Sequence, residues 1–196
     1  MRNILLIIGL IFFSLRTNAQ DSIYKKKFDP ENLFIGGSIS LGLGGYNNEF
    51  VAGIHPHFGY TLAKWIDVAT LINFEYNSSK DIYNNKYHNT TYGLGVLSRI
   101  YPVNFLFLQV EPEYNFIALK FIPDVGSVQK LKVNAPSLLI GAGYVTSRSD
   151  KNSFTYLSIL IDVLKDPNSP YIDGNGNSIL VIRAGINIGL TTRRTR

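Results

Sequence analysis

Two histidines, His55 and His57, are the residues whose type and spacing come closest to a chemical site. Residues two apart in an extended strand point to the same side, so the pair could bind a metal such as Zn²⁺ together with Glu111 or Glu113. The alternative is polar filling of an interior, where each buried polar group needs a partner and a histidine can donate or accept. We favour interior histidines, and we predict no metal site and no cofactor.

Charged residues recur on the same side of several alternating stretches, and we expect them to form an interior charge network of Asp67, Arg99, Glu111, Glu113, Asp162 and Arg183. Regular hairpins would bring Asp67 near Arg99, and Asp162 near Arg183. Unpaired buried charges are costly, whereas pairs with additional hydrogen bonds are tolerable. The network would therefore stabilise a polar core rather than catalyse a reaction.

Signatures of common catalytic sites are absent from the sequence, including G-x-S-x-G, H-E-x-x-H and G-x-x-x-x-G-K-[ST]. An enzyme acting on lipid would need its nucleophile on the lipid-facing surface or at the outer rim. His55 and His57 face inward by their position in the alternation, and His88 lies in a polar stretch that we expect to be a loop. We therefore predict no catalytic residues, with a small enzyme acting on lipid A as the alternative.

The elements that position these residues are strands with one apolar and one polar face. The last stretch shows the pattern, since Leu180, Ile182, Ile186 and Ile188 alternate with polar or small residues that include Arg183. Similar alternation predicts eight strands, at 33–43, 50–62, 66–77, 91–101, 105–118, 135–146, 153–164 and 178–190. Their lengths are close to the roughly 9–11 residues with which a tilted strand crosses a bilayer.

The connections and the apolar face favour an all-β fold, an eight-stranded antiparallel up-and-down transmembrane β-barrel. Short turns follow the second, fourth and sixth strands, and long connections follow the third, fifth and seventh, as is typical of outer-membrane barrels. The apolar face is nearly free of charge, and its aromatic residues collect at the strand ends, as at bilayer interfaces. An eight-stranded barrel is too narrow for an aqueous pore, so we expect a plugged polar interior. A soluble lipocalin-like barrel that binds an apolar ligand is the alternative.

The ends of the chain divide it further. Residues 1–19 have the layout of a signal peptide, with Arg2, a short apolar run and Ala19 at the expected cleavage site. We expect residues 20–32 to be a mobile periplasmic leader, 33–190 the barrel and 191–196 a C-terminal tail. Removal of the signal lowers the formal net charge from +5 to +3, because Arg2 and Arg16 leave with it. This small charge argues against nucleic acid as a partner.

This architecture resembles the small eight-stranded outer-membrane barrels, a group that includes the membrane domain of OmpA. In particular, the chain is similar to the outer-membrane β-barrel proteins of Bacteroidota in its Asn- and Tyr-rich loops and in the Ala19-Gln20 junction. It departs from many such barrels at the C-terminus, where Leu190 precedes a basic tail instead of a terminal aromatic residue. The resemblance implies residence in the cell outer membrane, contact with its lipid, and insertion by the barrel-assembly machinery. The expected role is structural, or interaction with an unidentified surface ligand through long extracellular loops such as 78–90 and 165–177.

Overall fold

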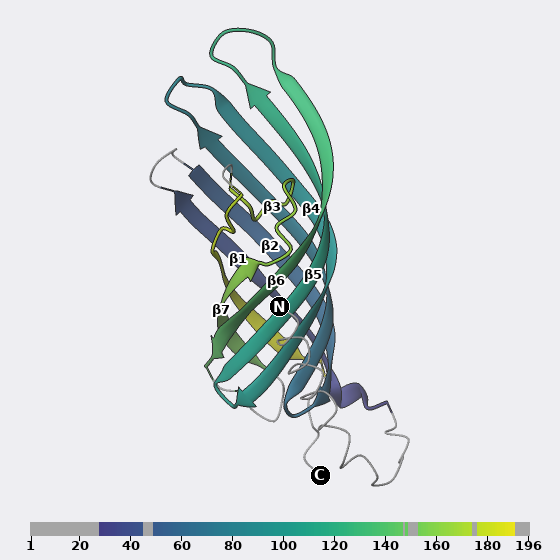
Figure 1. The fold of residues 1–196 in the computed structure, drawn as a ribbon. Helices are drawn as coiled ribbons and strands as arrows, with labels where there is room; N and C mark the ends of the chain where they lie inside the picture. Colours follow the sequence, from purple (N-terminus) through teal and green to yellow (C-terminus); the bar gives the residue numbers. More distant parts are fainter. Residues whose placement is uncertain (1–27, 45–48, 147, 149–152, 174–175, 191–196) are drawn as a thin grey trace, which may run out of the picture.

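A computed structural model describes residues 28–44, 49–146, 148, 153–173 and 176–190. The expected signal peptide, the leader up to residue 27 and the tail 191–196 lie outside the described residues. Within the described part of the chain, eight antiparallel strands form a closed barrel in which each pairs with its neighbour in sequence and β1 also pairs with β8 (Figure 1). The strands are β1 (Leu33–Gly44), β2 (Glu49–Ala63), β3 (Ile66–Lys80), β4 (Lys86–Val103), β5 (Leu106–Ile122), β6 (Gln129–Val145), β7 (Phe154–Asp162) and β8 (Val181–Gly189).

The fold class predicted from the alternation, and the fold implied by the resemblance, are confirmed. In β5, exposed and buried residues alternate without interruption from Leu106 to Ile117. Gln109, Glu111 and Glu113 face inward, and the outward positions of this stretch carry no charged residue. The same parity places both strand-two histidines inside. No helix in the described ranges is both long and apolar enough to span a membrane.

Four strands are longer than the sequence suggested. Residues 78–90 and 120–134, expected as loops, lie mostly in strands, because β3–β4 and β5–β6 pair in an unbroken register up to Lys80–Lys86 and Phe121–Gln129. Both segments are rich in polar residues and turn-forming residues, yet their outer parts keep the strand period. These two hairpins therefore extend well beyond β7 and β8 (Figure 1). By contrast, most of residues 163–180 lie outside strands.

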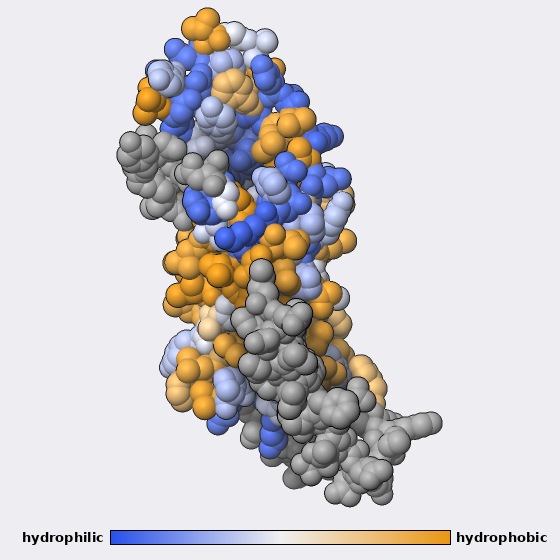
Figure 2. Space-filling view, in the orientation of Figure 1, coloured by the Kyte–Doolittle hydropathy of each residue, from blue (hydrophilic) through white to orange (hydrophobic). Residues whose placement is uncertain are grey.

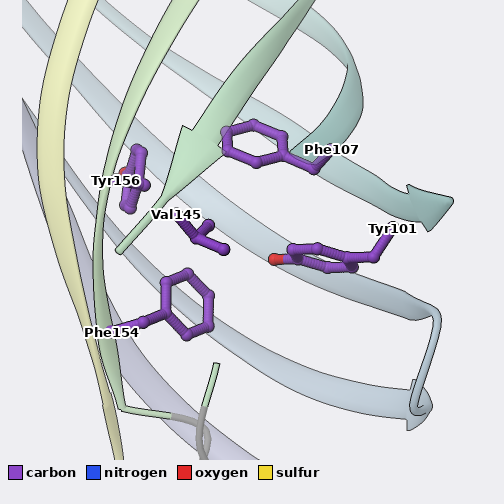
Figure 3. Packing of buried hydrophobic residues seen from close by; sticks show 5 residues of the cluster. All are labelled: Tyr101, Phe107, Val145, Phe154 and Tyr156. Atoms are coloured by element: carbon purple, nitrogen blue, oxygen red, sulfur yellow. The ribbon is translucent and has the colours of Figure 1, made fainter. Parts of the chain in front are cut away.

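The barrel interior holds large aromatic side chains as well as polar ones, whereas the sequence suggested mainly polar groups there. One apolar cluster, shown in Figure 3, lies near the end with the short turns and consists of Tyr101, Phe107, Val145, Phe154 and Tyr156. Two further clusters contain Phe34 with Leu71, and Leu139 with Tyr171. The interior is thus divided into apolar regions around a polar centre.

Inward-facing glycines make room for inward-facing rings. Three aromatic residues each lie directly opposite a glycine on a neighbouring strand, and a Cβ added to that glycine would collide with the ring. The pairs are Phe34 with Gly59, Phe107 with Gly143, and Tyr156 with Gly185. This arrangement, in which a ring covers a cross-strand glycine, lets a narrow barrel accommodate aromatic residues.

Two local features concern single positions. A proline within a sheet usually marks a bulge or an edge strand, but the β2–β3 register is the same on both sides of Pro56, and the register shift lies between Thr61 and Ala63. The last five residues of the expected mobile leader are packed on the barrel. Pro30–Asn32 form a 3-10 helix, and the hydroxyl of Tyr60 accepts hydrogen bonds from the Asp29 amide (3.2 Å) and the Asn32 side chain (3.3 Å).

Candidate functional site

The two interior histidines share one side of β2 but bind different partners. His55 Nε2 lies 3.1 Å from the Ser40 hydroxyl, and His57 Nε2 lies 2.8 Å from Asn187 Oδ1. Both rings are buried. Within the described part of the chain, no group of three or more His, Cys, Asp or Glu side chains could hold a metal ion. The histidines therefore act in this structure as partners of neighbouring polar side chains.

Arg183 on β8 is the centre of the interior polar cluster. Its guanidinium forms an ion pair with Glu111 through Nη1, and Nη2 lies 3.3 Å from Glu113 Oε1. Nη2 also donates to the hydroxyl of Tyr171 at 3.2 Å. Arg183, Glu111 and Glu113 are only 2%, 1% and 5% exposed, so these contacts are shielded from bulk water.

Tyr171 brings the β7–β8 connection into the barrel. Its hydroxyl donates to Glu113 Oε2 (2.8 Å) and accepts from Asn73 Nδ2 (2.8 Å). Asn73 Nδ2 also donates to Glu113 Oε2 at 3.1 Å and to Asn115 Oδ1 at 3.0 Å. A residue from a connecting segment is thus fixed by side chains of β3 and β5, which closes the polar centre toward the end with the long hairpins.

Asp162 holds the base of the same connection, and its expected pairing with Arg183 is wrong. Its carboxylate accepts from the amides of Leu138 and Leu164 (both 3.0 Å) and from the Ser169 hydroxyl (2.6 Å). The register explains the difference, because the residue opposite Arg183 on β7 is Ser158. Asp162, at the end of β7, therefore fixes the chain direction after the strand.

Asp67 and Arg99 lie opposite each other in the β3–β4 register, but their strongest contacts are with other residues. Asp67 forms an ion pair with Arg148 (2.7 Å). Arg99 Nε donates to Gln109 Oε1 (2.9 Å), and its guanidinium carbon lies 3.8 Å from the Tyr156 ring centroid. Because the Arg99 guanidinium stacks on the ring of Tyr156, it does not form the expected ion pair with Asp67.

The six charged residues are thus placed in three groups. Gln109 links two of them, since its Nε2 donates to Glu111 Oε2 at 2.6 Å while its Oε1 accepts from Arg99. Asp67 with Arg148 forms the second group, and Asp162 with Ser169 the third. The sequence offered a signal for Gln109, Asn73 and Asn115, which occupy inward positions of their strands. It offered none for Arg148 or Tyr171, which lie outside the strands.

Little free space remains in this region. A cavity among the described residues of this region has a volume of about 10 Å³ and is bounded by both histidines, Arg99, Glu111 and Arg183, among others. A cavity of that size holds about one water molecule. An organic substrate would not fit in this cavity.

A second polar region lies on the outward face of the extended hairpins. His88 belongs to β4, not to a loop as expected, and its Nδ1 lies 2.5 Å from the Tyr76 hydroxyl. A hollow of about 440 Å³ borders this pair and three lysines, Lys120, Lys130 and Lys132. The hairpin end is ordered by Asp81, whose carboxyl pKa is lowered, chiefly by the hydrogen bond from the Asn85 side chain (2.8 Å).

Comparison with known proteins yields similarity of structure only. No model of a known protein family matches the chain, and no curated protein sequence matches it. A crystal structure of Ail, the attachment invasion locus protein of Yersinia pestis, in complex with the heparin analogue sucrose octasulfate aligns with a TM-score of 0.45 and 11% identity, covering 79% of this chain and 92% of that one. The N-terminal β-barrel domain of Pseudomonas aeruginosa OprF aligns with a TM-score of 0.42 and 14% identity, covering 80% and 96%.

Proposed function

We propose that this chain is an outer-membrane β-barrel protein with a plugged polar interior, and that it acts through its surface rather than as an enzyme. The observation that carries the proposal is a ring of exposed apolar side chains around the barrel. Each strand contributes at least one large member, namely Ile39, Ile54, Ile72, Leu94, Leu108, Ile140, Ile159 and Ile182. Soluble monomers rarely expose so large a continuous apolar surface, and a closed barrel leaves no unpaired edge strand in lipid.

The distribution of aromatic residues supports the same orientation. Phe74, Tyr92 and Tyr114 are exposed toward the hairpin end of the ring, and Trp65 and Tyr144 are exposed toward the short-turn end. Figure 2 shows the apolar band around the middle, with a hydrophilic region above it on the hairpins. Two aromatic belts around an aliphatic band match the two interfaces of a bilayer. The long hairpins then project outside the cell, and the short turns face the periplasm.

The packed interior supports a role without transport. The contacts of Arg183, the inward rings and the small volume of the cavity that they surround favour an interior closed to solutes. A structural or surface-interaction role therefore depends on the β3–β4 and β5–β6 hairpins. The alternative enzyme acting on lipid would require activity that is lost in His55→Ala, His57→Ala or His88→Ala.

Heat-modifiable gel mobility tests the proposal. Protein extracted from membranes in detergent should run faster unboiled than boiled, because a closed barrel stays compact in detergent. Epitope tags at residues 123–128 and at 104–105 then test the orientation. The first should be labelled on intact cells, and the second only after the outer membrane is permeabilised. A protein that is soluble without detergent and shows no mobility shift would overturn the proposal in favour of the lipocalin-like alternative.

A further inference from the structure

The extended hairpins carry five lysines, all on the outward face. Inward and outward positions alternate without a register shift through the extended parts of β3, β4, β5 and β6. The lysines occupy outward positions on all four strands, at Lys80, Lys86, Lys120, Lys130 and Lys132. Among the described residues, the outward positions within 76–80, 86–92, 116–122 and 130–134 include no Asp or Glu. This face is therefore uniformly basic.

The lysines lie at graded heights above the outer aromatic belt. Phe116 belongs to that belt, where it stacks on Tyr92 with centroids 5.5 Å apart. Lys132, opposite Ala118, lies one outward row above Phe116, and Lys120, opposite Lys130, lies two rows above it. At about 3.3 Å per residue, these rows are roughly 7 Å and 13 Å beyond the ring. The Lys80–Lys86 pair is one row farther out.

Nothing in the described structure neutralises these lysines. The three ion pairs found among the described residues all involve Asp67, Glu111 or Glu113. Lys120 and Lys130 lie directly opposite each other, an arrangement that is destabilising for like charges. They border, with Lys132, Tyr76 and His88, the hollow of about 440 Å³. An anion in this hollow would remove the repulsion and accept several hydrogen bonds.

We propose that Lys120, Lys130 and Lys132 form a binding site for the phosphate groups of lipid in the outer leaflet. The inference rests on the proposed membrane location, and it names the lipid chemistry that this surface would recognise. We identify lipid as the occupant because the site is continuous with the apolar band and lies on the same outward side of the barrel. In a membrane, the lipid headgroups next to the band are closer to this site than any soluble partner. Lysine stems can lie along apolar surface while their ammonium groups reach the headgroups. Anionic surfaces attract such groups by charge.

Binding of lipid A to the protein purified in detergent tests the site, with native mass spectrometry as the readout. The probe is lipid A that carries two phosphates, and the comparison is the same lipid after phosphate removal. Lys120→Gln/Lys130→Gln should weaken binding of the phosphorylated lipid about 30-fold, since each lysine near an anionic surface contributes about 1 kcal/mol. Lys120→Arg/Lys130→Arg should retain binding. The matched control is Lys80→Gln/Lys86→Gln, which removes an equivalent opposed pair higher on the same face and should have a smaller effect.

The outcomes separate this inference from the proposed function. A wild-type protein that shows heat-modifiable mobility but binds both lipids equally would overturn the phosphate site and leave the membrane barrel standing. An equal loss of binding affinity in the two glutamine variants would also overturn the phosphate site. The effect would then reflect the net charge of the protein and not the position of Lys120 and Lys130 close to the outer aromatic belt. Protein that is water-soluble, with no mobility shift, would overturn the membrane location itself.

Discussion

Replacing Arg183 by Met should strongly destabilise the barrel. The change removes the ion pair with Glu111, the contact with Glu113 at 3.3 Å and the hydrogen bond to Tyr171 at 3.2 Å. It leaves two carboxylates in a region where both residues are at most 5% exposed. Breaking a buried ion pair by removing one partner costs about 3–5 kcal/mol, mostly because the remaining charge is left unpaired.

The same reasoning predicts recovery when the carboxylates are also neutralised. Arg183→Met combined with Glu111→Gln and Glu113→Gln removes the charges of the two carboxylates that Arg183 contacts. Part of the lost stability should therefore return, since a neutral replacement of a buried ion pair is often tolerated. Both variants and the wild type would be unfolded in urea in detergent micelles, with the unboiled gel band measuring the folded fraction. If Arg183→Met stays within about 1 kcal/mol of wild type, below the cost of an unpaired buried charge, the ion-pair account is refuted. A triple variant less stable than the single variant would refute it as well.

Three further predictions concern the band, the glycine pairs and the hairpin. Ile140→Arg should destabilise the barrel by about 2–4 kcal/mol in lipid vesicles, the cost of a charge at mid-membrane depth, and an unchanged urea midpoint would contradict a membrane location for the band. Gly143→Ala should cost about 1–3 kcal/mol because its Cβ would meet the Phe107 ring, whereas Gly37→Ala, with no contact closer than 3.5 Å, should unfold near the wild-type urea concentration. Because the Asp81 pKa is lowered, its stabilisation of the β3–β4 turn is present above the ordinary pKa and disappears as pH falls through the lowered value. NMR titration of the Asn85 amide should show this transition in the wild type, and its persistence in Asp81→Asn would exclude the carboxyl as its origin.

The alternation of residue types was sufficient to predict the barrel, because a strand that faces lipid on one side and a core on the other must follow a period of two. It also placed His55, His57 and Arg183 inside. The strand ends were less predictable. Lys86 and Gln129 begin strands whose outer parts are largely exposed and rich in polar residues, so the apolar signal that marks a strand is weak there.

The charge partners could not be predicted from hairpin pairing alone. An inward side chain in a narrow barrel reaches across the interior, so Arg183 of β8 binds Glu111 of β5 and not a neighbour on β7. Tyr171 and Arg148 enter from connections, and alternation does not indicate their direction. The inward direction of the aromatic rings could have been predicted, since Phe107 and Tyr156 occupy inward positions of their strands. Their compatibility with the barrel depends on the glycines opposite, which only the register reveals.

If the barrel lies in a membrane as proposed, its unequal strand lengths make one side of it different from the other within the membrane plane. The β3–β6 side rises as a wall, whereas β7 and β8 end low and their connection turns inward (Figure 1). A neighbouring protein would therefore contact either the long strands β3–β6 or the short strands β7 and β8, depending on the side from which it approaches. In the proposed orientation, large molecules outside the cell would reach the mouth of the barrel more easily from the side of β7 and β8. The surface that this protein presents to a neighbour thus depends on its rotation about the membrane normal.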